Sequence, residues 1–247
     1  MNEFNKTNFE ELMREAVIQH NLGDYEAALA LSNEAYEMAP DNSSEKGRAA
    51  RDNSARYDRL GKTEEAEQWA DEAFNIHDGL VKSMDDPNRE AYRERSVSAM
   101  YVAVNGLRKA IHAKQAGQTV DDLSFLDSMR LTWSDLQKAR AKANGLNRKI
   151  DQYAINASRR ASMAETLFGD RKIGLIIGAK AVALAFASES PMLDTSNPNL
   201  TTKQRLQAKK KALLGGVAAL GISVIASPKK MNKKRQKLAL KIADRAL

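Results

Sequence analysis

The feature that most limits the fold is a repeat of 38 residues near the start of the chain, in which residues 22–38 align with residues 60–76. The identical pairs are Leu22 and Leu60, Gly23 and Gly61, Glu26 and Glu64, Ala28 and Ala66, Glu34 and Glu72, and Ala35 and Ala73. In each copy the glycine lets two helices reverse direction, and the alanines let the second helix approach its neighbours closely. The repeat therefore predicts pairs of helices that stack to bury their apolar sides.

Helical periodicity continues after the repeat, and no run of alternating strand residues appears. Apolar residues recur every three or four positions between residues 87 and 116, at Val97, Met100, Tyr101, Val104, Leu107 and Ile111. The basic residues Arg93, Arg95, Arg108 and Lys109 are expected on other faces of this helix. A second stripe follows Gly117, at Leu123, Leu126, Met129, Trp133 and Leu136. We expect these two segments to form an antiparallel hairpin in an all-α fold of about ten helices.

The two repeat copies resemble the tetratricopeptide repeat family over roughly residues 9–78. The first copy carries Leu12, Ala16, Gly23, Asp24, Tyr25, Ala28, Ala35 and Pro40, and the second carries Tyr57, Gly61, Ala66 and Ala73. This resemblance implies antiparallel helical hairpins stacked as a right-handed solenoid, with additional C-terminal helices. The chain departs from the family pattern at several positions. Its period exceeds the usual ~34 residues, Ser32 and Ala70 replace a large residue, and Asp78 replaces proline.

Charge is distributed unevenly along the chain. Residues 1–94 contain 11 Lys and Arg against 22 Asp and Glu, whereas residues 95–247 contain 28 against 10. Together with the helical pattern, this distribution predicts acidic repeats over 1–84, long helical hairpins over 85–170, and basic helices rich in Gly and Ala over 171–247. Such asymmetry bears on partners and association rather than on the fold.

In repeats of this family the first helix of each pair lines a concave surface that binds an extended or helical peptide. The resemblance therefore implies a surface for another protein or peptide at Met13, Val17, His20, Arg48, Arg51 and Arg59. Family members that clamp a terminal carboxylate use Lys and Asn where this chain has Met13 and Val17, so that activity is not expected. Arg48 and Arg51 are candidates to bind acidic groups of a partner. Alternatively, Met13 and Val17 are covered by the chain's own later helices.

Two apolar runs, over residues 173–187 and 212–226, raise the question of membrane contact. Each has 15 residues, which corresponds to about 22 Å of helix against a hydrocarbon layer of about 30 Å. Gly174 and Gly178 have a spacing that permits close helix contact in lipid or in a protein core. Buried helices and a membrane-inserted hairpin both remain open.

Residues 171–247 hold 16 basic residues against 3 acidic ones. The candidate anion-binding residues are Lys209, Lys210, Lys211, Lys229, Lys230, Lys233, Lys234 and Arg235. The last five of them are expected in the N-terminal turns of the last helix, where the helix dipole disfavours cations. Candidate anions are nucleic acid, acidic membrane and the protein's own acidic first domain. The alternative is a solvated basic face that only aids solubility.

The sequence contains no cysteine and three scattered histidines, which gives no spacing typical of a metal site and no disulfide framework. No nucleophile motif or phosphate-binding glycine loop appears, so we expect neither catalysis, a cofactor nor a small-molecule substrate. The first residues lack the basic start and apolar run of a secretory signal, which predicts a cytoplasmic protein, with peripheral membrane association as an alternative. The leading hypothesis is a non-catalytic scaffold for protein interaction. The alternative is an anion-binding module built on the basic C-terminal third.

Overall fold

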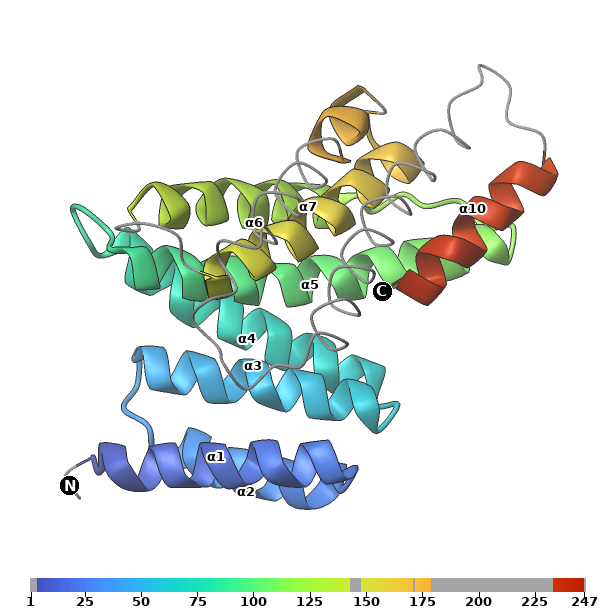
Figure 1. Ribbon diagram of the computed structural model, residues 1–247. Helices are drawn as coiled ribbons and strands as arrows, with labels where there is room; N and C mark the ends of the chain where they lie inside the picture. Colours follow the sequence, from blue (N-terminus) through green and yellow to red (C-terminus); the bar gives the residue numbers. More distant parts are fainter. Residues whose placement is uncertain (1–3, 143–147, 171, 179–232, 247) are drawn as a thin grey trace, which may run out of the picture. The chain divides into compact units, whose positions relative to one another are not determined.

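The computed structural model describes residues 4–142, 148–170, 172–178 and 233–246, and their secondary structure is helical throughout (Figure 1). The helices are α1 (Lys6–Leu22), α2 (Tyr25–Met38), α3 (Ser44–Arg59), α4 (Thr63–Lys82), α5 (Arg89–Gln115), α6 (Ser124–Ala141), α7 (Arg148–Phe168) and α10 (Lys233–Ala246). Residues 172–178 form a further helical segment. Because these residues contain no β-strand, the prediction of an all-α fold is confirmed.

The chain divides into two compact units, residues 1–102 (unit 1) and 103–247 (unit 2). The boundary lies inside α5, whereas the sequence predicted boundaries after residues 84 and 170. Charge and loop composition cannot reveal such a boundary, because α5 is one continuous helix of 27 residues.

The predicted glycine turns are present in unit 1. Gly23 follows α1 with a φ of 87°, and Gly61 follows α3 with a φ of 72°. Glycine adopts this left-handed conformation without steric cost, so each helix ends there and the chain reverses. The Asp24 side chain then accepts a hydrogen bond of 3.0 Å from the amide of Ala27 and caps the start of α2.

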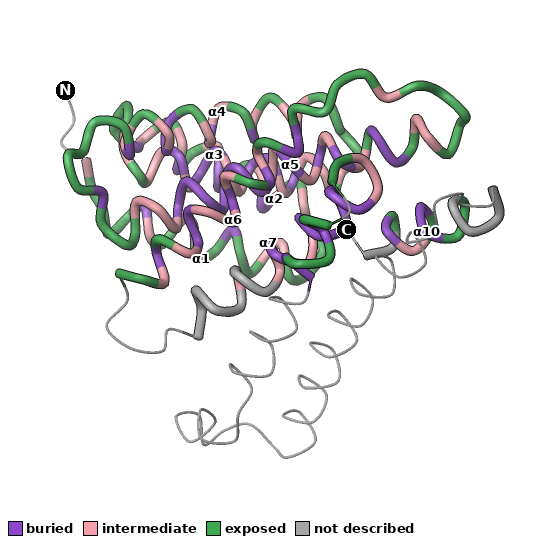
Figure 2. The backbone as a smooth tube through the Cα atoms, turned by 90° about the horizontal axis from the view of Figure 1, so that it is seen from above, coloured by how far each residue is buried: buried purple, intermediate pink, exposed green. Residues whose placement is uncertain are grey.

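Consecutive helices of unit 1 lie against one another, α1 on α2, α2 on α3 and α3 on α4 (Figure 1). Figure 2 shows buried residues along their facing sides. The repeat alanines, Ala28, Ala35, Ala66 and Ala73, are all buried, as the close approach of the helices requires.

The core of unit 2 combines the second half of α5 with α6, α7, the 172–178 segment and α10. Its large buried members include Leu107, Ile111, Phe125, Leu126 and Met129. Most of the two predicted apolar stripes are therefore buried. Leu123 is an exception, because it precedes α6 and is exposed.

Candidate interaction surface

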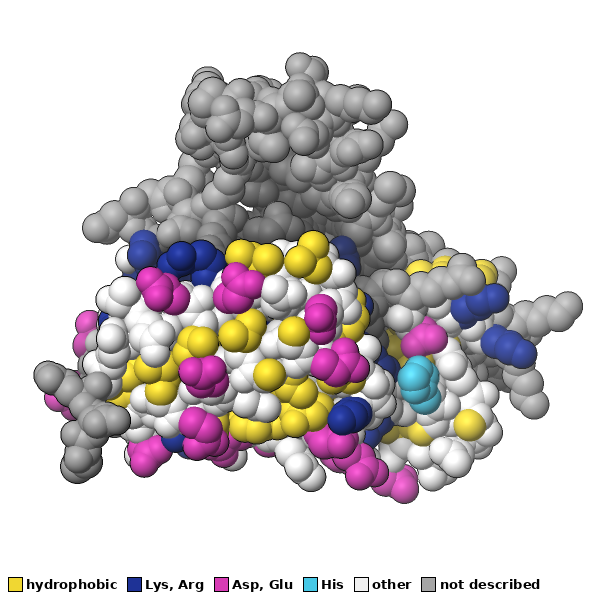
Figure 3. Space-filling view, turned by 90° about the horizontal axis from the view of Figure 1, so that it is seen from below, with side chains coloured by type: hydrophobic (Ala, Val, Ile, Leu, Met, Phe, Trp, Pro, Cys, Tyr) yellow, Lys and Arg dark blue, Asp and Glu magenta, His cyan; other side chains and the backbone are white. Residues whose placement is uncertain are grey.

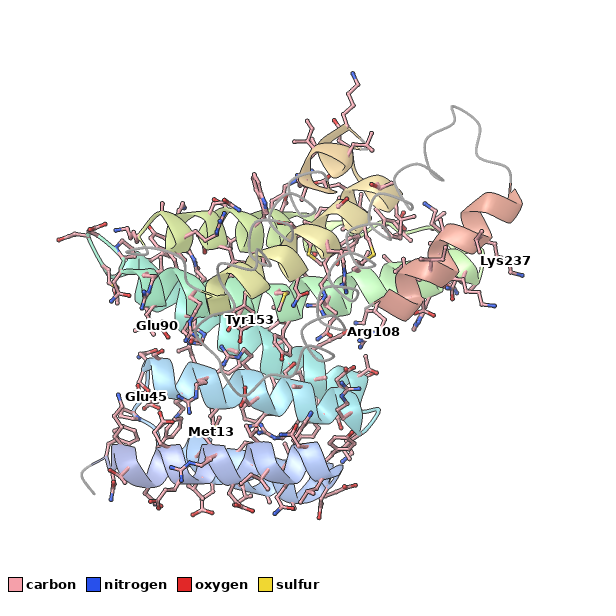
Figure 4. All side chains as sticks on the ribbon, in the orientation of Figure 1. Met13, Glu45, Glu90, Arg108, Tyr153 and Lys237 are labelled. Carbon is pink, nitrogen blue, oxygen red and sulfur yellow. The ribbon has the colours of Figure 1, made fainter. Side chains whose placement is uncertain are left out.

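The predicted residues Met13 and Val17 have different environments although both lie on α1. Met13 is buried on the side of α1 that faces α3, and it packs in a cluster with Phe9 and Ala49 (Figure 4). The residues of this cluster belong to the first three helices and their connections, not to the later helices that the alternative interpretation invoked. Val17 has an exposed fraction of 47% and remains open to a partner.

His20 of α1 lies within the electrostatic influence of two arginines of α3. Its half-buried ring lies edge-on to Tyr25, with 5.2 Å between ring centroids. Burial lowers the pKa of His20, and the charges of Arg56 and Arg59 lower it further. Arg59 is exposed in the last turn of α3. The structure thus brings His20 and Arg59, which were predicted together, close to each other, with Val17 one turn earlier on α1.

Arg56 is a residue of this region that the sequence prediction missed. Its side chain is 3% exposed, and its Nε and Nη1 atoms have no hydrogen-bond partner. The remaining Nη2 atom lies 3.8 Å from a carboxylate oxygen of Asp52. Burial lowers the pKa of the Arg56 guanidinium, although Asp52 opposes the shift. No sequence signal separates Arg56 from the other arginines of α3, because helical spacing does not specify which one turns inward.

Arg48 and Arg51 have carboxylate partners within the chain. Arg48 donates to both carboxylate oxygens of Glu10, at 2.9 and 2.7 Å, and lies over the ring of Phe9. Arg51 forms an ion pair with Glu94 of α5. In this structure both guanidinium groups hold helices of unit 1 together, so neither is free to meet a partner without giving up these bonds.

Many of the buried residues in the first half of α5 are polar or charged. Burial by itself raises the pKa of Glu94. The positive charges of Arg51 and Arg93 lower the pKa by more than burial raises it, so the net shift is downward. Arg95 is also buried and donates a 3.0 Å hydrogen bond to Asp78. The prediction that Arg95 lies on a face away from the core is therefore wrong. A paired charge can be buried, and the periodicity of one helix does not show the partner.

His77 of α4 is buried against both α3 and α5. Its Nδ1 atom lies 2.9 Å from the hydroxyl of Ser98. A Cβ atom added at Gly47 of α3 would lie 2.6 Å from the Cε1 atom of the His77 ring, so the ring packs directly on the α3 backbone. Burial, followed by the charge of Arg51, lowers the pKa of His77 to about 4. The imidazole is therefore neutral at physiological pH.

Two departures from the repeat pattern have structural counterparts. Ser32 is buried, and its hydroxyl donates to the side-chain oxygen of Asn53. The Asn53 amide in turn donates to Asn33 at 2.8 Å. A large residue at position 32 would occupy the space that Asn53 fills. Similarly, Asp78, which the resemblance aligns with a proline, accepts the hydrogen bond from Arg95.

Only part of the predicted anion-binding set can be placed. Five of its members lie outside the described residues: Lys209, Lys210, Lys211, Lys229 and Lys230. Lys233, Lys234 and Arg235 belong to the first turn of α10, but their side chains lie outside the described part of the structure. Further along this helix, Lys237 and Lys241 are exposed, and Figure 4 shows Lys237 on the outer side of α10.

The beginning of the first apolar run packs on α7. The hydroxyl of Ser162 donates a 2.7 Å hydrogen bond to the carbonyl of Gly174, and a Cβ atom at Gly178 would lie 2.8 Å from the same hydroxyl. The two glycines thus allow close helix contact within unit 2. The rest of this run, and the run over 212–226, lie outside the described residues. Among those that are described, no helix has both the length and the apolar character needed to cross a membrane.

The predicted region of α1 and α3 thus has an exposed aliphatic side chain at Val17, an exposed guanidinium at Arg59 and a buried one at Arg56. No group of three or more His, Asp or Glu able to hold a metal ion occurs in the described part of the chain. No protein-family model, curated protein or solved structure matches this chain.

Proposed function

We propose that this protein is a non-catalytic scaffold that binds another protein or peptide on a surface formed by α1 and α3. The scaffold would consist of tetratricopeptide-like helical hairpins arranged as a solenoid. The observation that carries the proposal is the exposed Val17 side chain, one turn before His20 on α1, whose ring lies within the electrostatic influence of the exposed Arg59 on α3. We name these three residues the α1/α3 surface.

The chemistry of the α1/α3 surface favours a peptide with an apolar anchor next to an acidic group. Val17 offers exposed aliphatic area, and Arg59 offers an exposed cation at a helix end. Arg56 adds a buried positive charge that also lowers the pKa of His20, and its Nε and Nη1 atoms have no hydrogen-bond partner. Arg48, near the other end of α3, is held by Glu10, which leaves Arg59 as the more accessible cation.

Site-specific photo-crosslinking tests this proposal. A photoreactive amino acid replaces Val17 in the full-length protein, and irradiation in cell extract should give discrete adducts. The Arg59→Glu substitution should reduce these adducts by about tenfold, because it replaces an attractive charge with a repulsive one. The same photoreactive residue at Met84, which is also an exposed apolar position, serves as the matched control.

Two outcomes would count against the α1/α3 surface. The first is the absence of adducts at Val17. The second is an identical adduct pattern at Met84, which would mean that any exposed apolar position captures the same proteins.

A second candidate function is binding of anions by the basic C-terminal helix. The observation that favours it is the exposure of Lys237 and Lys241 on one side of α10. Binding to DNA, RNA or anionic liposomes should weaken steeply as salt is raised, since each neutralised phosphate releases counterions. The double substitution Lys237→Glu and Lys241→Glu should weaken it further. Undetectable binding to all three at low salt would refute this function.

A further inference from the structure

The outer side of α1 exposes large apolar side chains. Ile18 and Leu22 have exposed fractions of 44% and 74%, and Leu22 is the most exposed large apolar residue in the described part of the chain. They continue a stripe that begins with Glu11 and Glu15, at spacings of four, three and four residues. This stripe lies opposite the buried side of α1 at Phe9, Met13 and Ala16. Within unit 1, no helix packs on it.

The outer side of α2 is acidic. It carries Glu26, Ala30, Glu34 and Glu37, all exposed, and α2 contains no Lys or Arg. Glu34 and Glu37 lie toward the C-terminal end of the helix, where the helix dipole disfavours negative charge. A sequence that keeps carboxylates there accepts a local electrostatic cost, which a cationic partner would remove.

The stripes of α1 and α2 lie on one side of the first hairpin and form what we name the hairpin face. Its members are Glu11, Glu15, Ile18, Leu22, Glu26, Ala30, Glu34 and Glu37. Figure 3, which views the molecule from the side of α1 and α2, shows Asp and Glu side chains separated by hydrophobic ones over these helices. The carboxylates of the hairpin face form no ion pair with other described residues; Glu15 accepts a hydrogen bond from Gln19. The hairpin face therefore fits a basic amphipathic helix, whose apolar residue would cover Leu22 and whose cations would meet the carboxylates.

The chain itself contains a helix with this chemistry. In α10 the buried side consists of Ala239, Leu240 and Ala243. The opposite side exposes Lys237, Leu238 and Lys241, which we name the α10 face, and Leu238 has an exposed fraction of 50%. The first turn of α10 contains no acidic residue. Basic residues thus lie at the N-terminal end of α10, where the helix dipole disfavours positive charge, just as acidic residues lie toward the C-terminal end of α2, where the dipole disfavours negative charge.

We propose that the α10 face of one copy docks on the hairpin face of a second copy, so that the protein associates head to tail. Each face is exposed in its own unit, each joins an aliphatic side chain to charges, and the charges are opposite in sign. A head-to-tail contact uses two different surfaces, so it builds rings or chains of molecules rather than a closed symmetric dimer. This inference does not depend on the proposed α1/α3 surface, since Val17 and Arg59 belong to neither face.

Sedimentation velocity of the full-length protein tests this contact. The protein must first be freed of nucleic acid, because a polyanion would occupy the α10 face. At about 50 mM NaCl the average mass should rise with protein concentration, and at about 500 mM the association should weaken by about tenfold or more, since salt screens the paired charges. A charge contact within one molecule would show no dependence on concentration.

Charge reversal identifies the surfaces. The Glu34→Lys and Glu37→Lys double variant should be monomeric at low salt. It should also remain folded, because cations near the C-terminal end of α2 suit the helix dipole. The Lys237→Glu and Lys241→Glu variant should likewise be monomeric. A mixture of the two variants should associate again, since the unmodified α10 face of the first variant can dock on the unmodified hairpin face of the second.

The matched control is Asp85→Lys with Asp121→Lys, which makes the same change in net charge at exposed positions outside both faces. It should associate like the unmodified protein. A monomer at every concentration in low salt would overturn the proposal. Association that the Glu34 and Glu37 substitutions leave unchanged, or a mixture that stays monomeric, would overturn it as well.

Discussion

Gly106 of α5 packs so closely on α6 that adding one methyl group should destabilise unit 2. A Cβ atom at this position would lie 2.8 Å from the Cβ atom of Phe125. Ordinary contacts between carbon atoms are about 3.5–4.0 Å. No change of side-chain rotamer can relieve the overlap, because the Cβ atom of Phe125 moves only with its backbone. The Phe125 ring is also fixed, edge-on to Phe168 with 5.5 Å between centroids.

The expected cost follows from two opposing effects. Overpacking a core by a methyl group costs about 1–3 kcal/mol. Alanine gains about 1 kcal/mol over glycine in a helix interior. Because relief here requires two helices to separate, we expect the packing cost to exceed the gain. Gly106→Ala should therefore lower the free energy of unfolding by up to about 2 kcal/mol, or the Tm by up to several degrees.

Gly79 of α4 provides the matched control. It is exposed in a helix, and a Cβ atom there would have no atom within 4 Å. The same substitution at this position should raise the free energy of unfolding by about 0.5–1 kcal/mol. The same Gly→Ala substitution should thus change the free energy of unfolding in opposite directions at these two helical positions.

Fluorescence during urea unfolding can report on the two units separately. Trp69 of α4 lies in unit 1, and Trp133 of α6 lies in unit 2. Gly106→Ala is measured in a Trp69→Phe background and Gly79→Ala in a Trp133→Phe background. If Gly106→Ala leaves the Trp133 transition unchanged or moves it to higher urea, the packing argument is refuted.

Three further predictions concern the ion pairs and His77 of unit 1. The pKa of His77 in the folded protein lies at about 4, below its ordinary value of 6.5. Between these two pH values the unfolded chain binds more protons at this residue than the folded protein does. The free energy of unfolding should therefore fall by about 3 kcal/mol as the pH drops from 7 toward 4. His77→Gln should remove most of this dependence in acid-unfolding titrations. Glu94→Gln should cost up to about 3–5 kcal/mol in urea unfolding, because it removes the nearer counter-charge of the buried Arg51 guanidinium and leaves only Asp52, at 3.6 Å. Arg48→Ala should cost less than about 1 kcal/mol, since Arg48 and its partner Glu10 are both partly exposed to solvent. Equal costs for these two substitutions would contradict the role assigned to burial.

Local patterns in the sequence predicted the helices well. The spacing of apolar residues in α5 and α6, the glycines after α1 and α3, and the repeat alanines all depend on interactions between residues close in sequence. The predicted surface was less accurate. Of its six residues, Met13 is buried, and Arg48 and Arg51 are held by Glu10 and Glu94. The buried guanidinium of Arg56 was not foreseen.

By itself, the sequence determined that the chain is all-helical, where most helices begin and end, and that its charge is strongly divided. Those properties follow from periodicity, glycine turns and composition, each of which acts over a few residues. Only the tertiary structure decided which charges are buried in pairs, where α5 passes from one unit to the other, and which sides of α1, α2 and α10 remain uncovered. These depend on contacts between residues far apart in the chain, such as Arg51 with Glu94. The residue pattern of one helix does not specify which residues of another helix pack against it or pair with its charges.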